Sequence, residues 1–248
     1  MNRFWLNAAF YQASLADGNS GKNPAVGCVL VKNDQIIGVG HTSKGGRPHA
    51  EENALKMAGK DAKGANMYLT LEPCCLDDNL NSCTRQIIRA GVKKVFIGMI
   101  DYNKLTKRKS FQYLLNHGVQ VELIFLDFEN FLLNYSQYCV HVLNRPQITI
   151  KLASSADSKI TYANGESKWI TSKLSRSHVH QIRSNHDGIL VGSKTSKIDD
   201  PSLTVRVPGY KKNIHRLVLD TNLNININSN LTKNLSKNPL VIFTSENT

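Results

Sequence analysis

The sequence predicts an α/β protein of two domains, residues 1–145 and 146–248. Short apolar runs alternate with segments of helical period along the whole chain, which is typical of sheets covered by helices. A chain of 248 residues has room for two cores of ordinary size. The boundary is placed at Arg145-Pro146, because proline cannot continue the long helix expected before it.

The first half is expected to form one layered α/β/α domain, with helices between the strands of a five-stranded sheet. Asn33-Asp34 is a turn signal, so the first two strands are predicted to pair antiparallel. The expected strands are 25–31, 35–39, 66–71, 92–99 and 119–125, and the expected helices are 4–15, 51–59, 84–90, 111–116 and 128–143.

The second half shows a similar alternation of apolar strands with one clear helix. The helix is expected over 172–183, capped by Thr171 or Ser172. The Asn-rich stretch 222–238 is predicted to be a loop. The expected strands are 147–153, 188–191, 216–219 and 240–244.

Four residues in the first half form a candidate metal site. His49, Cys74 and Cys83 carry the imidazole and thiolate ligands that Zn²⁺ prefers, and Glu51 follows His49 by two positions. The order H-x-E, then P-C, then a second cysteine is typical of zinc deaminases that act on nucleobases. Here eight residues separate the two cysteines, which is wider than the usual P-C-x-x-C ending.

Three protein ligands leave one position on tetrahedral zinc for water, and zinc lowers the pKa of that water to about 7. Glu51 is predicted to be catalytic, carrying a proton from water to a ring nitrogen and then to departing ammonia. Residues two apart on a helix face different sides, so His49 is expected at or before the first turn. The alternative is a structural zinc site, for which Cys75 or His41 could supply the fourth ligand.

The net charge of +12 has three interpretations: nucleic-acid binding, a phosphorylated small-molecule substrate, or a Lys- and Asn-rich genome. The basic residues are scattered, which argues against nucleic acid as the partner. Five cysteines, an odd number, do not indicate a disulfide framework. No stretch approaches the about 18 apolar residues of a membrane span. Polar residues interrupt the N-terminal apolar run, so no signal peptide is expected and the predicted location is cytoplasmic.

Several motifs resemble the bifunctional deaminase/reductase family of riboflavin biosynthesis, the RibD type. In the first half they are NPAVG at 23–27, PHAEENA at 48–54, and LEPC at 71–74 with Cys83 at the wide spacing of that family. In the second half they are KLA at 151–153, GESKWIT at 165–171, HQIR at 180–183, DGILVG at 187–192 and DDPSLTVR at 199–206. The resemblance covers the whole chain.

The resemblance implies a cytidine-deaminase-like domain that deaminates a phosphoribosylated diaminopyrimidine. It implies a second domain of dihydrofolate-reductase-like fold that uses NADPH to reduce the ribosyl group to ribityl. By position, the family's substrate-binding residues correspond to Lys151, Ser167, Arg183, Leu203 and Arg206. Its cofactor-binding residues correspond to Ala153, Trp169, Thr171, Thr195, Asp199 and Thr221.

The chain departs from the family at positions of the first half that, in the family, help to bind the substrate. Leu76 and Asn79 stand where the family has a histidine and a basic residue, Asp77 and Asp78 add negative charge, and Thr42 replaces a histidine. Two alternatives therefore stay open: a zinc deaminase of another base, nucleotide or tRNA, and a non-catalytic basic zinc protein that binds RNA. The family's reductase continues further than this chain, so an incomplete reductase is expected, and a homo-oligomer is left open.

Overall fold

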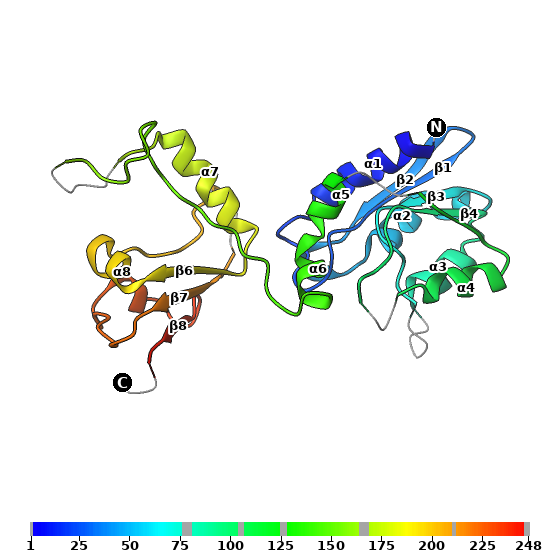
Figure 1. Ribbon diagram of the computed structural model, residues 1–248. Coiled ribbons are helices and arrows are strands. Elements are labelled where there is room, and N and C mark those ends of the chain that lie inside the picture. Colours follow the sequence, from blue (N-terminus) through cyan, green and yellow to red (C-terminus); the bar gives the residue numbers. More distant parts are fainter. Residues whose placement is uncertain are drawn as a thin grey trace. The chain divides into compact units, whose positions relative to one another are not determined.

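The computed structural model describes residues 2–75, 81–103, 107–124, 128–163, 169–209 and 212–245. They divide into two compact units, Met1–Thr149 and Ile150–Thr248 (Figure 1). The boundary predicted after residue 145 lies a few residues before this division. No helix in the described ranges combines the length and the apolar character that a membrane crossing requires.

Unit 1 contains a five-stranded sheet with the strand order β2-β1-β3-β4-β5 (Figure 1). β1 pairs antiparallel with both β2 and β3, whereas β3, β4 and β5 run parallel. The hairpin predicted at Asn33-Asp34 is confirmed, and both residues have positive φ. The strands are β1 Gly27–Lys32, β2 Gln35–His41, β3 Asn66–Leu69, β4 Lys94–Ile97 and β5 Gln120–Leu123.

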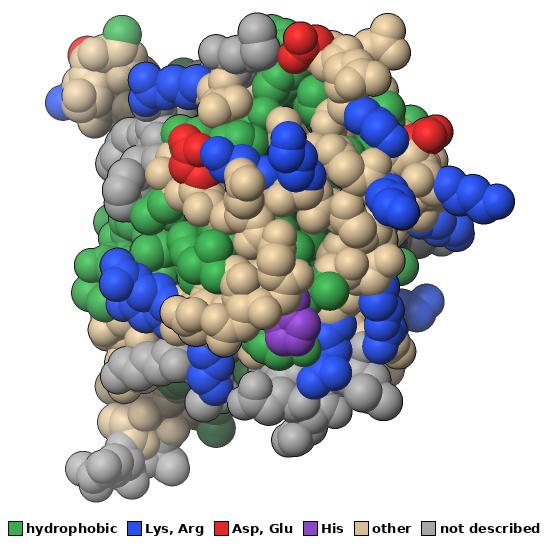
Figure 2. All heavy atoms as spheres, turned by 90° about the vertical axis from the view of Figure 1, so that its right-hand side faces the viewer, with side chains coloured by type: hydrophobic (Ala, Val, Ile, Leu, Met, Phe, Trp, Pro, Cys, Tyr) green, Lys and Arg blue, Asp and Glu red, His purple; other side chains and the backbone are tan. Residues whose placement is uncertain are grey.

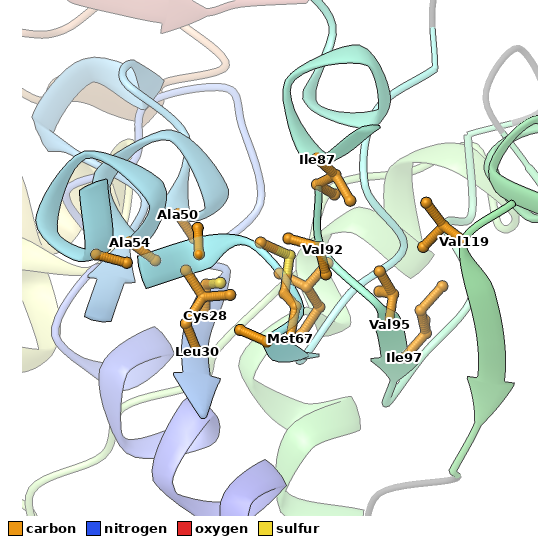
Figure 3. Close-up of a cluster of buried hydrophobic side chains, with 14 of the residues drawn as sticks. Cys28, Leu30, Ala50, Ala54, Met67, Ile87, Val92, Val95, Ile97 and Val119 are labelled. Carbon is orange, nitrogen blue, oxygen red and sulfur yellow. The ribbon is translucent and has the colours of Figure 1, made fainter. Parts of the chain in front are cut away.

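Two apolar clusters lie on opposite sides of this sheet and confirm the predicted layers. On one side, Leu6 and Ala9 of α1 pack with Val29, Tyr68 and Phe96. On the other, buried residues of α2, α3 and α4 pack against the sheet (Figure 3). This larger cluster includes Leu30, Ala54, Met67, Ile87, Val95, Ile97 and Leu114. The four helices are α1 Asn2–Ser14, α2 Ala50–Ala58, α3 Cys83–Arg89 and α4 Lys109–Asn116.

The single helix predicted over 128–143 is wrong, because the chain breaks at Asn134 into α5 Phe128–Leu133 and α6 Tyr135–His141. Asn134 has φ −108° and ψ 19°, and its side-chain Nδ2 donates a hydrogen bond of 3.1 Å to the carbonyl of Ala25. This partner lies 109 residues away in the sequence, so helical periodicity alone could not indicate the break.

Asn134 is 1% exposed, and its side-chain amide donates a hydrogen bond to the buried carbonyl of Ala25. We expect Asn134→Ala to lower the free energy of unfolding by about 1–3 kcal/mol, the cost of leaving such a carbonyl unpaired. Urea denaturation of the full chain measures this, with Asn116→Ala at the exposed end of α4 as the control. Equal stabilities of the two variants would contradict the assigned role.

Unit 2 contains a three-stranded parallel sheet with the order β6-β7-β8. β6 Gly188–Gly192, β7 His215–Leu219 and β8 Leu240–Phe243 lie close to three of the predicted strands. α7 Lys173–Ser184 is capped by Ser172, whose side chain accepts from the amide of Ser175. α8 Ser193–Asp199 was not predicted, since its sequence SKTSKID has no apolar period. The Asn-rich loop is confirmed apart from a short turn, η3 Asn230–Thr232.

The strand predicted over 147–153 is wrong, because these residues form no regular element and belong to neither sheet. Their apolar residues alternate as in a strand, yet Ile148, Ile150 and Leu152 are 72%, 90% and 75% exposed. Alternation predicts an extended segment with one apolar face. It does not show which strand supplies the hydrogen bonds, and none of the described strands does so here.

Arg216, the second residue of β7, is 1% exposed, and the described hydrogen-bond partners of its guanidinium are main-chain oxygens of the Asn-rich loop. Its guanidinium donates to the carbonyls of Asn230 at 3.4 Å, of Lys233 at 3.1 Å and of Asn238. Burial lowers the pKa of this guanidinium. Arg216 therefore joins the sheet of unit 2 to the Asn-rich loop through polar contacts.

Candidate active site

His49 and Glu51 are brought together by the start of α2. His49 is the N-cap of this helix, with an extended backbone at φ −72° and ψ 167°, and Glu51 lies in the first turn. The expectation that His49 precedes the helical turns is confirmed. Gly40 of β2 permits the close approach of α2, since a Cβ there would lie 2.2 Å from the carbonyl oxygen of Ala50.

The three predicted metal ligands converge in space. The ligand atoms of His49, Cys74 and Cys83 all lie within 4.8 Å of one another. His49 Nδ1 is 3.3 Å from Cys83 Sγ, and the amide of Cys83 donates to Cys74 Sγ at 3.3 Å. Among the residues that the structure describes, this group does not include Cys75 or His41. One imidazole and two sulfurs are a donor set that fits Zn²⁺ and provides three of its four ligands.

The ionisation of the site follows from its burial and from the short contacts between its groups. Burial and, to a smaller extent, the nearby sulfur of Cys74 raise the pKa of Glu51 to about 7. A hydrogen bond from Cys83 lowers the pKa of Cys74 to about 4. A hydrogen bond to Cys74 raises the pKa of His49. The site therefore combines a thiolate with a carboxyl group that changes charge near neutral pH.

We expect the burial of Glu51 to make the stability of the metal-free protein depend on pH. The folded-state pKa of about 7 lies above the ordinary 4.5, so ionisation favours the unfolded chain. The protonated carboxyl group of Glu51 therefore contributes stability at acid pH, and this stability is lost as the pH rises through about 7. In EDTA-treated protein, the stability gained by Glu51→Gln over the parent should grow by about 3 kcal/mol between acid and alkaline pH. A difference that does not change with pH would contradict it.

Of the two places where the chain departs from the family pattern, the structure describes Thr42 but not residues 76–80. Residues 76–80, which include Leu76, Asp77, Asp78 and Asn79, lie outside the described residues. Thr42 is buried, and its hydroxyl joins two parts of the chain. It donates to the carbonyl of Pro24 at 3.0 Å and accepts from the amide of Val26 at 3.0 Å. Thr42 therefore fixes the chain before β1.

In unit 2, three of the predicted residues share one hollow. Lys151, Ala153 and Thr171 line a hollow of about 550 Å³ between the segment 151–153 and α7. Among the described residues, Thr195 and Asp199 of α8 and Thr221 after β7 do not line it. Ser167 lies outside the described residues.

Trp169, predicted to contact the cofactor, is exposed on one side and is covered on its ring by Arg176. The guanidinium carbon of Arg176 lies 4.2 Å from the ring centroid, a cation–π distance. The sequence contains only a weak signal for Arg176, its position in the first turns of the helix that Ser172 caps. Arg176 therefore belongs to the surroundings of Trp169.

Arg183 and Arg206, predicted to bind the substrate, both lie near His180. The guanidinium of Arg206 is 3.2 Å from His180 Nε2, and the guanidinium of Arg183 donates to the carbonyl of Thr204 at 3.4 Å. Burial lowers the pKa of Arg183, and Arg206 lowers it further. Leu203 has φ 47°, and its side chain packs in the core with Val218 and Leu231. Its side chain is therefore turned to the core, and its backbone is the part left to meet a ligand.

Basic side chains are distributed over the surface. Figure 2 shows one face of the molecule, on which Lys and Arg lie in separate small groups between uncharged side chains. Nucleic-acid-binding proteins gather such residues on one stripe or patch. On this face, the distribution agrees with the scattering seen in the sequence.

The fold and site of unit 1 are those of the cytidine deaminase class of zinc-binding proteins, with three candidate ligands and a buried glutamate. Residues 2–99 match the family described as cytidine and deoxycytidylate deaminase zinc-binding region. Residues 146–248 match the RibD C-terminal domain. The chain belongs to the family of the riboflavin biosynthesis protein RibD. Membership confirms the predicted fold class, a cytidine-deaminase-like domain followed by a dihydrofolate-reductase-like one.

Similar proteins cover this chain almost completely. RibD of Aquifex aeolicus is 37% identical over 247 residues, which are 100% of this chain and 69% of that protein. The structure of Acinetobacter baumannii RibD, form 1, has a TM-score of 0.90 at 32% identity and covers 98% of this chain and 69% of its own. A Thermotoga maritima diaminohydroxyphosphoribosylaminopyrimidine deaminase/5-amino-6-(5-phosphoribosylamino)uracil reductase has a TM-score of 0.89 at 33% identity, covering 99% and 70%. The chain spans from 50% to 69% of the length of curated relatives that it matches.

Proposed function

We propose that unit 1 hydrolytically deaminates a phosphoribosylated diaminopyrimidine in riboflavin biosynthesis. The observation that carries this proposal is the convergence of His49, Cys74 and Cys83 beside the buried carboxyl group of Glu51. The substrate class is supported by the name of the Thermotoga maritima protein, which is 33% identical to this chain. The expected cytoplasmic location agrees with this role and remains a proposal.

The residues divide the work between holding a metal and moving a proton. His49, Cys74 and Cys83 would hold Zn²⁺, which supplies a Lewis acid and a nucleophile at neutral pH. Glu51 is not among the ligands, and it is 3% exposed. With a pKa of about 7, its carboxyl group can take a proton from the attacking water and release it to the ring nitrogen. It next takes the proton of the hydroxyl group formed on the ring carbon and delivers it to the departing amino group, so that a carbonyl forms, the C–N bond breaks and ammonia leaves.

For unit 2, we propose an NADPH-dependent reduction of the ribosyl group. Arg183 and Arg206 offer two guanidinium groups within one cluster, and guanidinium matches the oxygen geometry of phosphate. Lys151, Ala153 and Thr171 line a common hollow that can take a small molecule. The proposed substrate-binding residues also include Ser167 and Leu203. The proposed cofactor-binding residues also include Trp169, Thr195, Asp199 and Thr221.

The deaminase proposal is tested by ammonia release from the phosphoribosylated diaminopyrimidine by purified zinc-loaded chain. Cytidine, dCMP and a tRNA substrate serve as comparisons, and metal analysis accompanies every assay. Release from the diaminopyrimidine with little from the others supports the proposal. Ammonia release from one of the other substrates alone would show that the enzyme deaminates that substrate and would contradict the proposal. Zinc at full occupancy with no turnover and salt-dependent RNA binding would favour the non-catalytic alternative.

A further inference from the structure

Glu72 is a buried carboxylate in unit 1 that the proposed chemistry does not use. It lies two residues before Cys74 and is 4% exposed. Its side chain accepts four described hydrogen bonds, all from the segment that follows β4. The donors are the amides of Asp101 at 3.2 Å, Arg108 at 3.0 Å and Ser110 at 3.3 Å, and the hydroxyl of Ser110 at 2.7 Å.

Two of these amides are at the beginning of α4. Arg108 is the N-cap of this helix, with φ 60°, and it provides no side-chain cap. The first turn of α4 contains no acidic residue. The first amides of a helix have no partner inside it, and a negative charge near them is stabilising. Glu72 therefore caps α4 from the end of a strand that precedes the helix by many residues.

The other contacts hold the chain just after β4. The amide of Glu72 donates to the carbonyl of Met99 at 2.8 Å, and its carboxylate accepts from the amide of Asp101. The Asp101 carboxylate in turn accepts from the amide of Asn103 at 2.9 Å. β3 and β4 are parallel, and ligands in such sheets bind beyond the carboxyl ends of the strands. The segment 99–103 thus lies at the edge where Cys74 enters the metal site.

We propose that Glu72 is a positioning residue that fixes the segment 99–103 and the start of α4 as one wall of the deaminase substrate pocket. Glu72 binds neither metal nor substrate in this role. It sets where Asp101 and Asn103 lie relative to the metal ligands, and so it determines substrate affinity. The assignment of a substrate to this wall rests on the deaminase function proposed above.

A graded set of variants tests the proposal. Glu72→Ala removes all four bonds, Glu72→Gln keeps an acceptor for two of the amides, and Ser110→Ala removes only the hydroxyl. Glu122→Ala is the matched control, since this carboxylate pairs with Lys94 at the surface at 2.6 Å. In Glu72→Ala we expect zinc content to stay at the parental level. KM should rise about tenfold or more, while kcat changes by less than about threefold.

Hydrogen exchange gives a readout that does not depend on turnover. The amides of Asp101, Arg108 and Ser110 should exchange faster in the order Glu72→Ala, Glu72→Gln, Ser110→Ala, with no change in Glu122→Ala. If Glu72→Ala does not fold, the two milder variants provide the comparison. Zinc loss with unchanged exchange, or kinetics equal to those of the control, would overturn the proposal. If the parent releases no ammonia, the proposed function fails, and the exchange data still decide whether Glu72 positions this segment.

Discussion

Replacing Glu51 by Gln should abolish deamination while the protein keeps its zinc. The proposed ligands His49, Cys74 and Cys83 are unchanged by this substitution, and an amide has nearly the shape of the carboxyl group that it replaces. Gln cannot accept and return a proton, and general acid–base groups contribute about 10²–10⁴-fold to rate. We therefore expect kcat to fall by about a thousandfold at equal zinc content. Ammonia release and metal analysis on the same preparation measure both quantities.

Glu52→Gln is the matched control for this experiment. Glu52 is the next residue of α2, and its carboxylate pairs with Arg47 at 2.8 Å on a partly exposed surface. Surface pairs of this kind contribute little to stability, so this variant should retain parental zinc and nearly parental turnover. Parental turnover in Glu51→Gln would remove Glu51 from the proposed mechanism. Loss of zinc in Glu51→Gln would instead make it a structural part of the metal site.

Replacing Cys83 by Ser should release the metal and destabilise unit 1. Cys83 is 0% exposed and begins α3, its sulfur lies 3.3 Å from His49 Nδ1, and its amide donates to Cys74 Sγ. A serine hydroxyl is a poor substitute for a thiolate ligand of zinc. A ligand present at a thousand times its Kd stabilises the folded state by about 4 kcal/mol, and we expect a loss of that order. Bound zinc and the melting temperature, each with and without EDTA, are the measurements.

Cys139→Ser is the control, because Cys139 is also 0% exposed but lies in α6 and does not belong to the metal group. It should lose some stability through the burial of a hydroxyl and keep its zinc. EDTA should lower the melting temperature of the parent and of Cys139→Ser, and leave that of Cys83→Ser nearly unchanged. Full zinc occupancy in Cys83→Ser would show that Cys83 is not a ligand.

Much of unit 1 could be predicted because its local signals agree with its tertiary structure. The strands are short apolar runs, and the first turn of α2 contains two acidic residues shortly after His49, so periodicity and the helix-start signal agree. The errors occurred where a distant partner decides the local structure. The helix is interrupted at Asn134, whose side chain bonds to the distant Ala25. The residues 147–153 alternate as a strand does, yet they join no described sheet. α8 lacks any apolar period and is placed by the strands on either side of it.

The convergence of His49, Cys74 and Cys83 could be expected from the sequence, since a spacing of ligand types reflects chemistry that few other sites require, and their role as metal ligands stays a prediction. The role of Glu72 was not predictable in the same way. A glutamate before a proline and a cysteine carries no signal that it will cap a helix beginning at Lys109. The contacts of its oxygens with the amides of Arg108 and Ser110 arise only in the folded protein.

The contacts of Arg216 also bear on how the Asn-rich loop can change during evolution. A guanidinium that binds carbonyl oxygens does not distinguish one side chain from another, because every residue type offers the same acceptor. Substitutions at Asn230, Lys233 or Asn238 that preserve the path of the backbone therefore leave these bonds intact. The three bonds of Arg216 thus place no demand on the side chains at these positions, whereas exchange of the single arginine would remove all three bonds at once.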